Sequence, residues 1–182
     1  MLTVLARKSG YTDKVDKSQL LSLLARFDEE LEQKIILVAA GGTALTLLDA
    51  KPTTLDIDFT APSESIAIFD RVEKGIPHGF KIDRYKDGAI FSQILPEDYL
   101  TKSKKIRTGF KNIDLRALHP LDIVASKIGR LDERDKQDIA ACINKFGLTR
   151  KMVEDRARQV QYVGNEAIYN HNLGYVLKSF FN

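Results

Sequence analysis

The order of hydrophobic and polar residues predicts a helix near the start of the chain and a strand directly after it. Between Asp16 and Gln33 the hydrophobic residues recur at helical spacing, and Asp16 with Gln19 resembles a capping box. One face of this helix carries Leu20, Leu24, Phe27 and Leu31. The segment from Ile35 to Ala39 is short, wholly apolar and followed by a glycine pair, which indicates a buried strand.

The pattern then changes from helical spacing to alternation. Thr43 to Ala50 offers three leucines for burial and predicts a short helix, which Lys51 to Thr54 would end. From Leu55 to Phe59 apolar and acidic residues alternate, which predicts a strand with one face in the core. Leu55, Ile57 and Phe59 would face that core, and Asp56 and Asp58 would share the opposite face.

The rest of the chain divides into a mixed part and a helical part. The patterns predict a helix over 62–76, a hairpin of strands 80–85 and 89–95, a strand pair 106–110 and 113–118, and helices over 120–130, 132–145, 149–162 and 165–181. The one candidate boundary is His119-Pro120. We therefore predict an α+β fold, with a core over 1–118 and a helical segment over 119–182 packed on it.

Composition narrows the class of protein further. The chain has 182 residues and is 43% hydrophobic, which is enough for one core, and its net charge of +3 is too small to establish a nucleic-acid partner. A single cysteine, Cys142, excludes a disulfide framework, and the three histidines show no metal-ligand spacing. The longest apolar run is too short to cross a bilayer. We expect a cytoplasmic protein with no membrane partner.

The candidate chemistry lies between Gly41 and Asp58. Carboxylates at i and i+2 on a strand point the same way, so Asp56 and Asp58 could hold a divalent cation from one side. The Gly41-Gly42 turn would open a helix and bring backbone N–H groups close to a phosphate, and Thr43 adds a hydroxyl there. An isolated D-x-D pair is more often ordinary surface charge. The order of glycines, short helix and D-x-D strand is more informative than either half.

That order resembles the nucleotidyltransferase superfamily, that of DNA polymerase β and the minimal nucleotidyltransferases, whose signature is a G-G/S turn followed by D-hydrophobic-D. A closer resemblance, over about Ile35 to Ile139, is to bacterial and archaeal nucleotidyltransferase families related to abortive-infection type IV toxins. Those families carry G-G-[ST], T-x-D-I-D and a later K-x-x-x-R…R-D-x-x-D segment. The matching residues here are Gly41, Gly42, Thr43, Asp56, Asp58, Lys127, Arg130, Arg134, Asp135 and Asp138.

The resemblance implies a nucleotidyltransferase-like mixed sheet and a role for each matching residue. Asp56 and Asp58 would bind Mg²⁺ or Mn²⁺, and an NTP would be the substrate. Lys127 would neutralise triphosphate charge, and Asp135 would orient Lys127 or the acceptor. The nucleotide-binding residues would be Gly41, Gly42, Thr43, Thr54, Lys127 and Arg130. The acceptor would be RNA, such as a tRNA end, or a protein, and an antitoxin would be a possible partner. The structural alternative for Lys127, Arg130, Arg134, Asp135 and Asp138 is a solvated helix face or a salt-bridge pair across the turn at Leu131.

The third carboxylate of the signature departs from the pattern. Asp114, on a predicted strand, is the first choice and would act as a catalytic residue; Asp83 is the second. Without a third acid near Asp56 and Asp58, the group that activates the attacking hydroxyl would be missing. The alternative function is therefore a non-catalytic nucleotide- or RNA-binding member that acts as an interaction or antitoxin module. A structural protein whose D-x-D is only surface charge is a third possibility.

Overall fold

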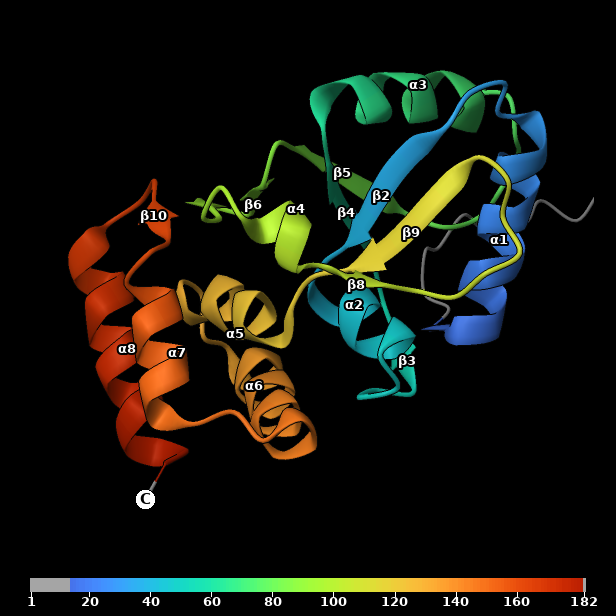
Figure 1. The fold of residues 1–182 in the computed structure, drawn as a ribbon. Coiled ribbons are helices and arrows are strands. Elements are labelled where there is room, and N and C mark those ends of the chain that lie inside the picture. Colours follow the sequence, from blue (N-terminus) through green and yellow to red (C-terminus); the bar gives the residue numbers. More distant parts are fainter. Residues whose placement is uncertain (1–13, 182) are drawn as a thin grey trace, which may run out of the picture.

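A five-stranded mixed sheet organises the protein, whose computed structural model describes residues 14–181 (Figure 1). The strands are β1 (Val15–Asp16), β2 (Ile35–Ala39), β3 (Thr53–Thr54), β4 (Ile57–Ala61), β5 (Ile82–Lys86), β6 (Ala89–Ile90), β7 (Gln93–Ile94), β8 (Lys104–Lys105), β9 (Ile113–Ala117) and β10 (Gln161–Tyr162). The helices are α1 (Lys17–Glu30), α2 (Gly41–Leu47), α3 (Ser63–Glu73), α4 (Tyr99–Lys102), α5 (Pro120–Ile128), α6 (Glu133–Phe146), α7 (Arg150–Ala157) and α8 (Glu166–Ser179). The predicted α+β class is confirmed.

The strand order of the main sheet is β5-β4-β2-β9-β8, with the apolar β2 at its centre. β2 runs parallel to β9 and antiparallel to β4, and β4 runs parallel to β5. Helices α1 and α3 pack on this sheet through an aromatic cluster: the ring centroids of Phe27 and Phe69 lie 5.1 Å apart, and those of Phe59 and Phe69 lie 6.3 Å apart. The predicted capping box at Asp16 is present and begins α1.

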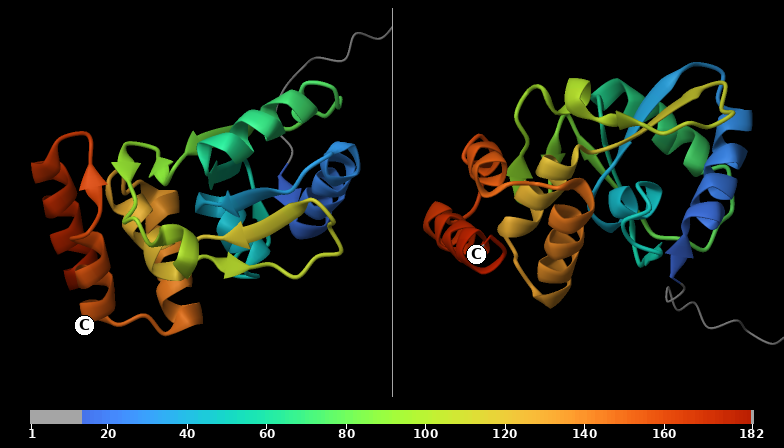
Figure 2. Two further views of the ribbon diagram at one scale, coloured as in Figure 1. Left: turned by 45° about the horizontal axis from the view of Figure 1, so that its top comes forward. Right: turned by 60° about the horizontal axis from the view of Figure 1, so that its bottom comes forward.

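The C-terminal helices form a separate layer beside the sheet. Helix α5 packs against α6, α7 and α8, and it also contacts α2. In both views of Figure 2, α8 and α1 lie at opposite ends of the molecule. The segment after 119 is not wholly helical as predicted, because β10 pairs with β7 and ties this layer to the earlier part of the chain. Between residues 14 and 181, none of the helices combines the length and hydrophobicity that a membrane crossing needs.

The predicted hairpin of strands 80–85 and 89–95 is wrong. β5 pairs with β4 instead, in parallel, because α3 supplies the crossover that parallel strands require. The segment 89–94 forms its own small hairpin, β6 and β7, joined by the two-residue turn Phe91-Ser92. Phe91 has φ 53° in this turn, a left-handed conformation that is unusual for a large side chain.

Three other boundaries differ from the predictions. The antiparallel partner of β9 is β8, so the predicted strand over 106–110 lies too late in the chain. Helix α7 ends at Ala157, well before Tyr162. Leu55, predicted to face the core, is 46% exposed, because β4 begins only at Ile57. The alternation had correctly placed Ile57 and Phe59, which are fully buried.

Candidate active site

The glycine pair lies directly against the carboxylate strand. β2 and β4 are antiparallel neighbours, and the N–H of Ala40 donates to the carbonyl of Asp58 over 2.9 Å, so the chain leaves β2 beside the start of β4. Helix α2 begins at Gly41, earlier than predicted, and Gly41 has φ 51°. A Cβ on Gly41 would come within 3.3 Å of Oδ2 of Asp58. This close approach, together with the positive φ, requires glycine.

Two threonine hydroxyls hold the backbone of the D-x-D segment. Oγ1 of Thr43 donates to the carbonyl of Asp56 and accepts from the N–H of Asp58, both over 3.0 Å. Oγ1 of Thr54 donates to the same Asp56 carbonyl over 2.9 Å. Thr43 is fully buried, so its hydroxyl positions the carboxylates and is not free to contact a phosphate as the sequence suggested. Thr54 lines the adjoining cavity.

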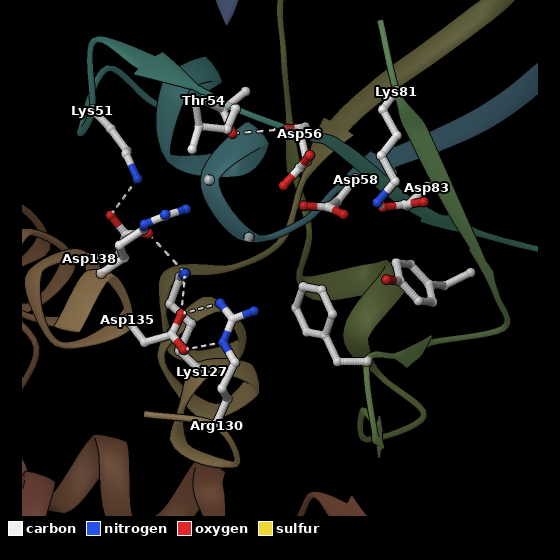
Figure 3. A pocket seen from close by; sticks show the side chains of 16 residues that line it. Lys51, Thr54, Asp56, Asp58, Lys81, Asp83, Lys127, Arg130, Asp135 and Asp138 are labelled. Carbon is white, nitrogen blue, oxygen red and sulfur yellow. Dashed lines mark hydrogen bonds and ion pairs between the residues drawn. The ribbon is translucent and has the colours of Figure 1, made fainter. Parts of the chain in front are cut away.

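Three carboxylates from two adjacent strands line one cavity of about 300 Å³, the D-x-D cavity (Figure 3). Asp58 lies in β4, Asp56 directly precedes that strand, and Asp83 of β5 is the register partner of Asp58. The ammonium of Lys81 lies 2.6 Å from Asp83. Asp114, the first choice from sequence, is not at this cavity: it lies on β9 and pairs with Arg116 at 2.7 Å. Asp83 therefore takes the position expected of Asp114, because β5 and not β9 lies beside β4.

Burial and like charge act together on Asp58. Its side chain is 8% exposed, and desolvation, followed by the charges of Asp83 and Asp56, raises its pKa from 3.8 to about 6. Lys127 and Lys81 oppose this shift. Tyr85 also lines the cavity, and its own burial, together with the charges of Asp58 and Asp83, raises its pKa to about 12. A carboxylate whose ionisation is this unfavourable lies where a cation would relieve the repulsion.

The opposite wall of the cavity is an ion-pair network from α5, α6, the turn between them and the loop after α2 (Figure 3). Nζ of Lys127, 5% exposed, lies 2.9 Å from Asp135 and 2.8 Å from Asp138. Arg130 donates two hydrogen bonds to Asp135, over 2.8 and 2.9 Å, and Lys51 lies 2.9 Å from Asp138. Burial would raise the pKa of Asp135, but hydrogen bonds and charge from Arg130 and Lys127 outweigh it and hold that pKa below 3.8. This wall is not a solvated helix face; it corresponds to the other structural alternative, salt bridges across the turn at Leu131.

The donor set at the D-x-D cavity is suited to a hard cation. Asp56 and Asp58 offer only carboxylate oxygens, the ligands that Mg²⁺ takes from proteins, usually with substrate phosphates and water completing the shell. In residues 14–181 no group of three or more acidic, histidine or cysteine side chains has the geometry of a complete metal site. A cation here would therefore depend on oxygens from its substrate.

A comparison with known protein families matches residues 18–173, from α1 to α8, to a family described as "Nucleotidyltransferase of unknown function (DUF6036)". The chain belongs to this nucleotidyltransferase family. The match agrees with the superfamily resemblance of the G-G-T and D-I-D segments and supports nucleotidyl transfer as the general function. No curated protein and no solved structure matches the chain.

Several cavity residues of this nucleotidyltransferase had no signal in the sequence. Lys51, Lys81, Tyr85 and Phe91 line the cavity beside the carboxylates, but each comes from a loop or strand whose placement no local pattern revealed. Asp83 had a partial signal, as an acid on a predicted strand. Asp83 lies beside Asp58 because β5 pairs in parallel with β4. No local sequence pattern indicated this pairing.

Proposed function

We propose that this nucleotidyltransferase moves NMP from an NTP to an acceptor hydroxyl at the D-x-D cavity, with Mg²⁺ or Mn²⁺ held by Asp56 and Asp58. The observation that carries the proposal is the convergence of Asp56, Asp58 and Asp83 on one cavity, next to the start of α2. In the transfer, the acceptor oxygen would bond to the α-phosphorus, the bond from that phosphorus to the bridging oxygen would break, and pyrophosphate would leave.

Different groups around the cavity would have different roles in the transfer. When bound, a divalent cation would neutralise phosphate charge and stabilise the developing negative charge. The first N–H groups of α2, at Gly41 and Gly42, have no carbonyl one turn earlier to accept them and would face the phosphates. Asp83 would accept the proton of the attacking hydroxyl. Lys127 already has two acidic partners, so its proposed part is to hold Asp135 and Asp138 in place more than to meet the triphosphate.

The test is transfer of label from each α-labelled NTP, with Mg²⁺ or Mn²⁺, to total RNA or to the protein itself. Asp56→Asn combined with Asp58→Asn should abolish labelling while circular dichroism stays unchanged. Asp83→Asn should lower the rate at least about a hundredfold, as expected for loss of a general base. Asp114→Asn is the matched control, since Asp114 lies outside the cavity. Full labelling by the double variant would refute the mechanism.

A second candidate is binding of nucleotide without turnover. The observation in its favour is the 2.6 Å ion pair between Lys81 and Asp83, which occupies the carboxylate that would otherwise take the proton. Under this alternative, wild-type protein binds NTP and Mg²⁺ in calorimetry but labels no acceptor. The Lys81→Met variant then decides between the two: it should gain labelling only if the ion pair is what holds Asp83 back.

A toxin role and an antitoxin partner stay predictions. Controlled expression of the chain in bacteria should arrest growth if the protein acts as a toxin, and the Asp56→Asn, Asp58→Asn double variant should not. Growth that is unaffected by active wild-type protein would exclude this role in the host tested.

A further inference from the structure

A second cavity of about 320 Å³ adjoins the D-x-D cavity and shares Phe91, Arg130 and Asp135 with it. It is called the Gln93 cavity here; its other lining residues are Ser92, Gln93, Ser126, Gly129 and Tyr162. Its volume falls within the range of about 300–1,000 Å³ that is typical of small-molecule sites. The transfer mechanism proposed above does not involve this cavity.

Gln93 presents an acceptor with no partner. Its side chain is 3% exposed, and Nε2 donates to the carbonyl of Ser126 over 2.8 Å. A carbonyl can only accept, so the amide nitrogen must face Ser126, and the amide oxygen must point elsewhere. Oε1 is buried and has no hydrogen-bond partner among residues 14–181. Because buried acceptors are nearly always paired, this oxygen needs a donor, which a water or a ligand in the Gln93 cavity can supply.

A pair of tyrosine rings and a glycine shape the Gln93 cavity beside the amide nitrogen of Gln93. Tyr162 stacks on Tyr169, with ring centroids 5.3 Å apart. The single O–H of Tyr169 is shared between the carbonyls of Ala125 and Ala157, which anchors the stack. A Cβ on Gly129 would come within 2.8 Å of both Nε2 of Gln93 and Cε2 of Tyr162. Glycine at this position therefore keeps the amide and the ring where they are.

Phe91 forms the wall between the two cavities at a conformational cost. Its φ of 53° is costly for a bulky residue, and its side chain is 43% exposed, so the ring does not serve the core. The ring packs edge-on against Tyr85, with centroids 5.5 Å apart, and the Arg130 guanidinium lies 5.9 Å from its centroid. A strained, half-exposed ring beside two cavities is suited to stacking on a planar ligand.

We propose that the Gln93 cavity is a nucleobase subsite that selects bases with an exocyclic amine, which would donate to Oε1 of Gln93. The proposal rests on the proposed function, since it places the base beside the cavity for the phosphates. The base belongs either to the NTP or to the terminal nucleotide of an RNA acceptor. Adenine, cytosine and guanine carry such an amine, and uracil does not, so uridine and UTP bind most weakly.

Calorimetry with matched ligands and variants tests this subsite. The ligands are adenosine, purine riboside (adenosine without its amine), Mg²⁺–ATP and inorganic tripolyphosphate. Wild-type protein should bind adenosine about tenfold more tightly than purine riboside. Gly129→Ala, which crowds the cavity, should weaken adenosine binding about tenfold, whereas Gly174→Ala should not, because a Cβ at Gly174 meets no atom within 4 Å. Phe91→Asn should also weaken binding, and it guards against misfolding because asparagine tolerates positive φ.

The ligands also separate the two sources of the base. Weaker binding of Mg²⁺–ATP by Gly129→Ala, with tripolyphosphate unchanged, assigns the subsite to the NTP. Weaker binding of adenosine with Mg²⁺–ATP unchanged assigns it to the acceptor. The proposal is overturned if Gly129→Ala and Phe91→Asn, both folded, bind adenosine and Mg²⁺–ATP within twofold of wild type. Adenosine needs neither metal nor turnover, so its binding would stand even if labelled transfer were never observed.

Discussion

Replacement of Asp58 by asparagine should make the metal-free protein more stable at neutral pH. Asp58 is buried beside Asp83 and Asp56, and its pKa rises from 3.8 to about 6 on folding. The folded state thus holds its proton more tightly than the unfolded state does. Below pH 3.8 the carboxyl is protonated in both states and does not lower the stability of the fold. Between pH 3.8 and about 6 its ionisation lowers the stability increasingly, and above pH 6 this loss of stability is constant.

The size of the effect follows from the pKa change. A rise from 3.8 to about 6 corresponds to about 3 kcal/mol at 1.36 kcal/mol per pKa unit. Asparagine has nearly the same shape and no charge, so Asp58→Asn should raise the free energy of unfolding by about 3 kcal/mol at pH 8 and by about 0.5 kcal/mol at pH 4. The residue proposed to bind the cation would then be one that the fold retains at a cost to stability.

The assay is urea denaturation followed by far-ultraviolet circular dichroism, in EDTA, at pH 4 and pH 8. Asp28→Asn is a control of opposite sign. Burial alone would raise the pKa of Asp28, but the N–H groups of Lys111, Asn112 and Ile113 donate to it and lower that pKa below 3.8. Asp28→Asn should therefore lose stability at pH 8.

Addition of Mg²⁺ together with an NTP should stabilise wild type more than it stabilises Asp58→Asn, because ligand that binds only the folded state adds to its stability. The reasoning about Asp58 is refuted if, in EDTA at pH 8, wild type is as stable as Asp58→Asn or more stable.

Three further substitutions test the scaffold around the carboxylates. Thr43→Val should cost about 2 kcal/mol in urea denaturation, because it leaves the buried N–H of Asp58 without its acceptor. Thr43→Ser should recover the loss, and equal stability of all three proteins would contradict the positioning role. Gly42→Ala should lower the free energy of unfolding by about 1–3 kcal/mol, since its Cβ would meet Oγ1 of Thr54 at 2.6 Å. Gly174→Ala, whose Cβ meets open space, is the control. Unchanged stability of Gly42→Ala would contradict this prediction. Lys127→Met should lower the free energy of unfolding by about 3–5 kcal/mol, because the buried Asp135 and Asp138 lose the Lys127 ammonium as a partner. A loss of nucleotide binding without any loss of stability would instead favour a direct contact of Lys127 with phosphate.

Local chemistry in the sequence was enough to predict several elements. The capping box placed the start of α1, the wholly apolar run placed β2, and the alternation placed Ile57 and Phe59 in the core. Each of these signals is carried by residues close together in the chain. The G-G-T and D-I-D segments likewise pointed to the nucleotidyltransferase family, which the match over 18–173 confirms.

The predictions failed where the partner of a segment lies far away in the sequence. The turn at Lys86 to Gly88 suggested a hairpin, yet β5 pairs with β4 across α3. That pairing decides that Asp83, and not Asp114, lies beside Asp58. Thr43 was predicted to meet phosphate, but the antiparallel packing of β2 and β4 turns its hydroxyl onto the backbone of the carboxylate strand.

The sequence by itself determined the start of α1, the central strand β2, the buried face of β4 and the family, because helix caps, periodicity and short motifs act over a few residues. Only the tertiary structure decided which third acid joins that pair, how Lys127 is neutralised, and that Gln93 meets Tyr162 and Phe91 at a second cavity. Several of these arrangements depend on strand order and on contacts between residues far apart in the chain, such as the hydrogen bond between Gln93 and Ser126. Burial then sets their electrostatics, since the pKa of Asp58 depends on which charges the fold brings near it.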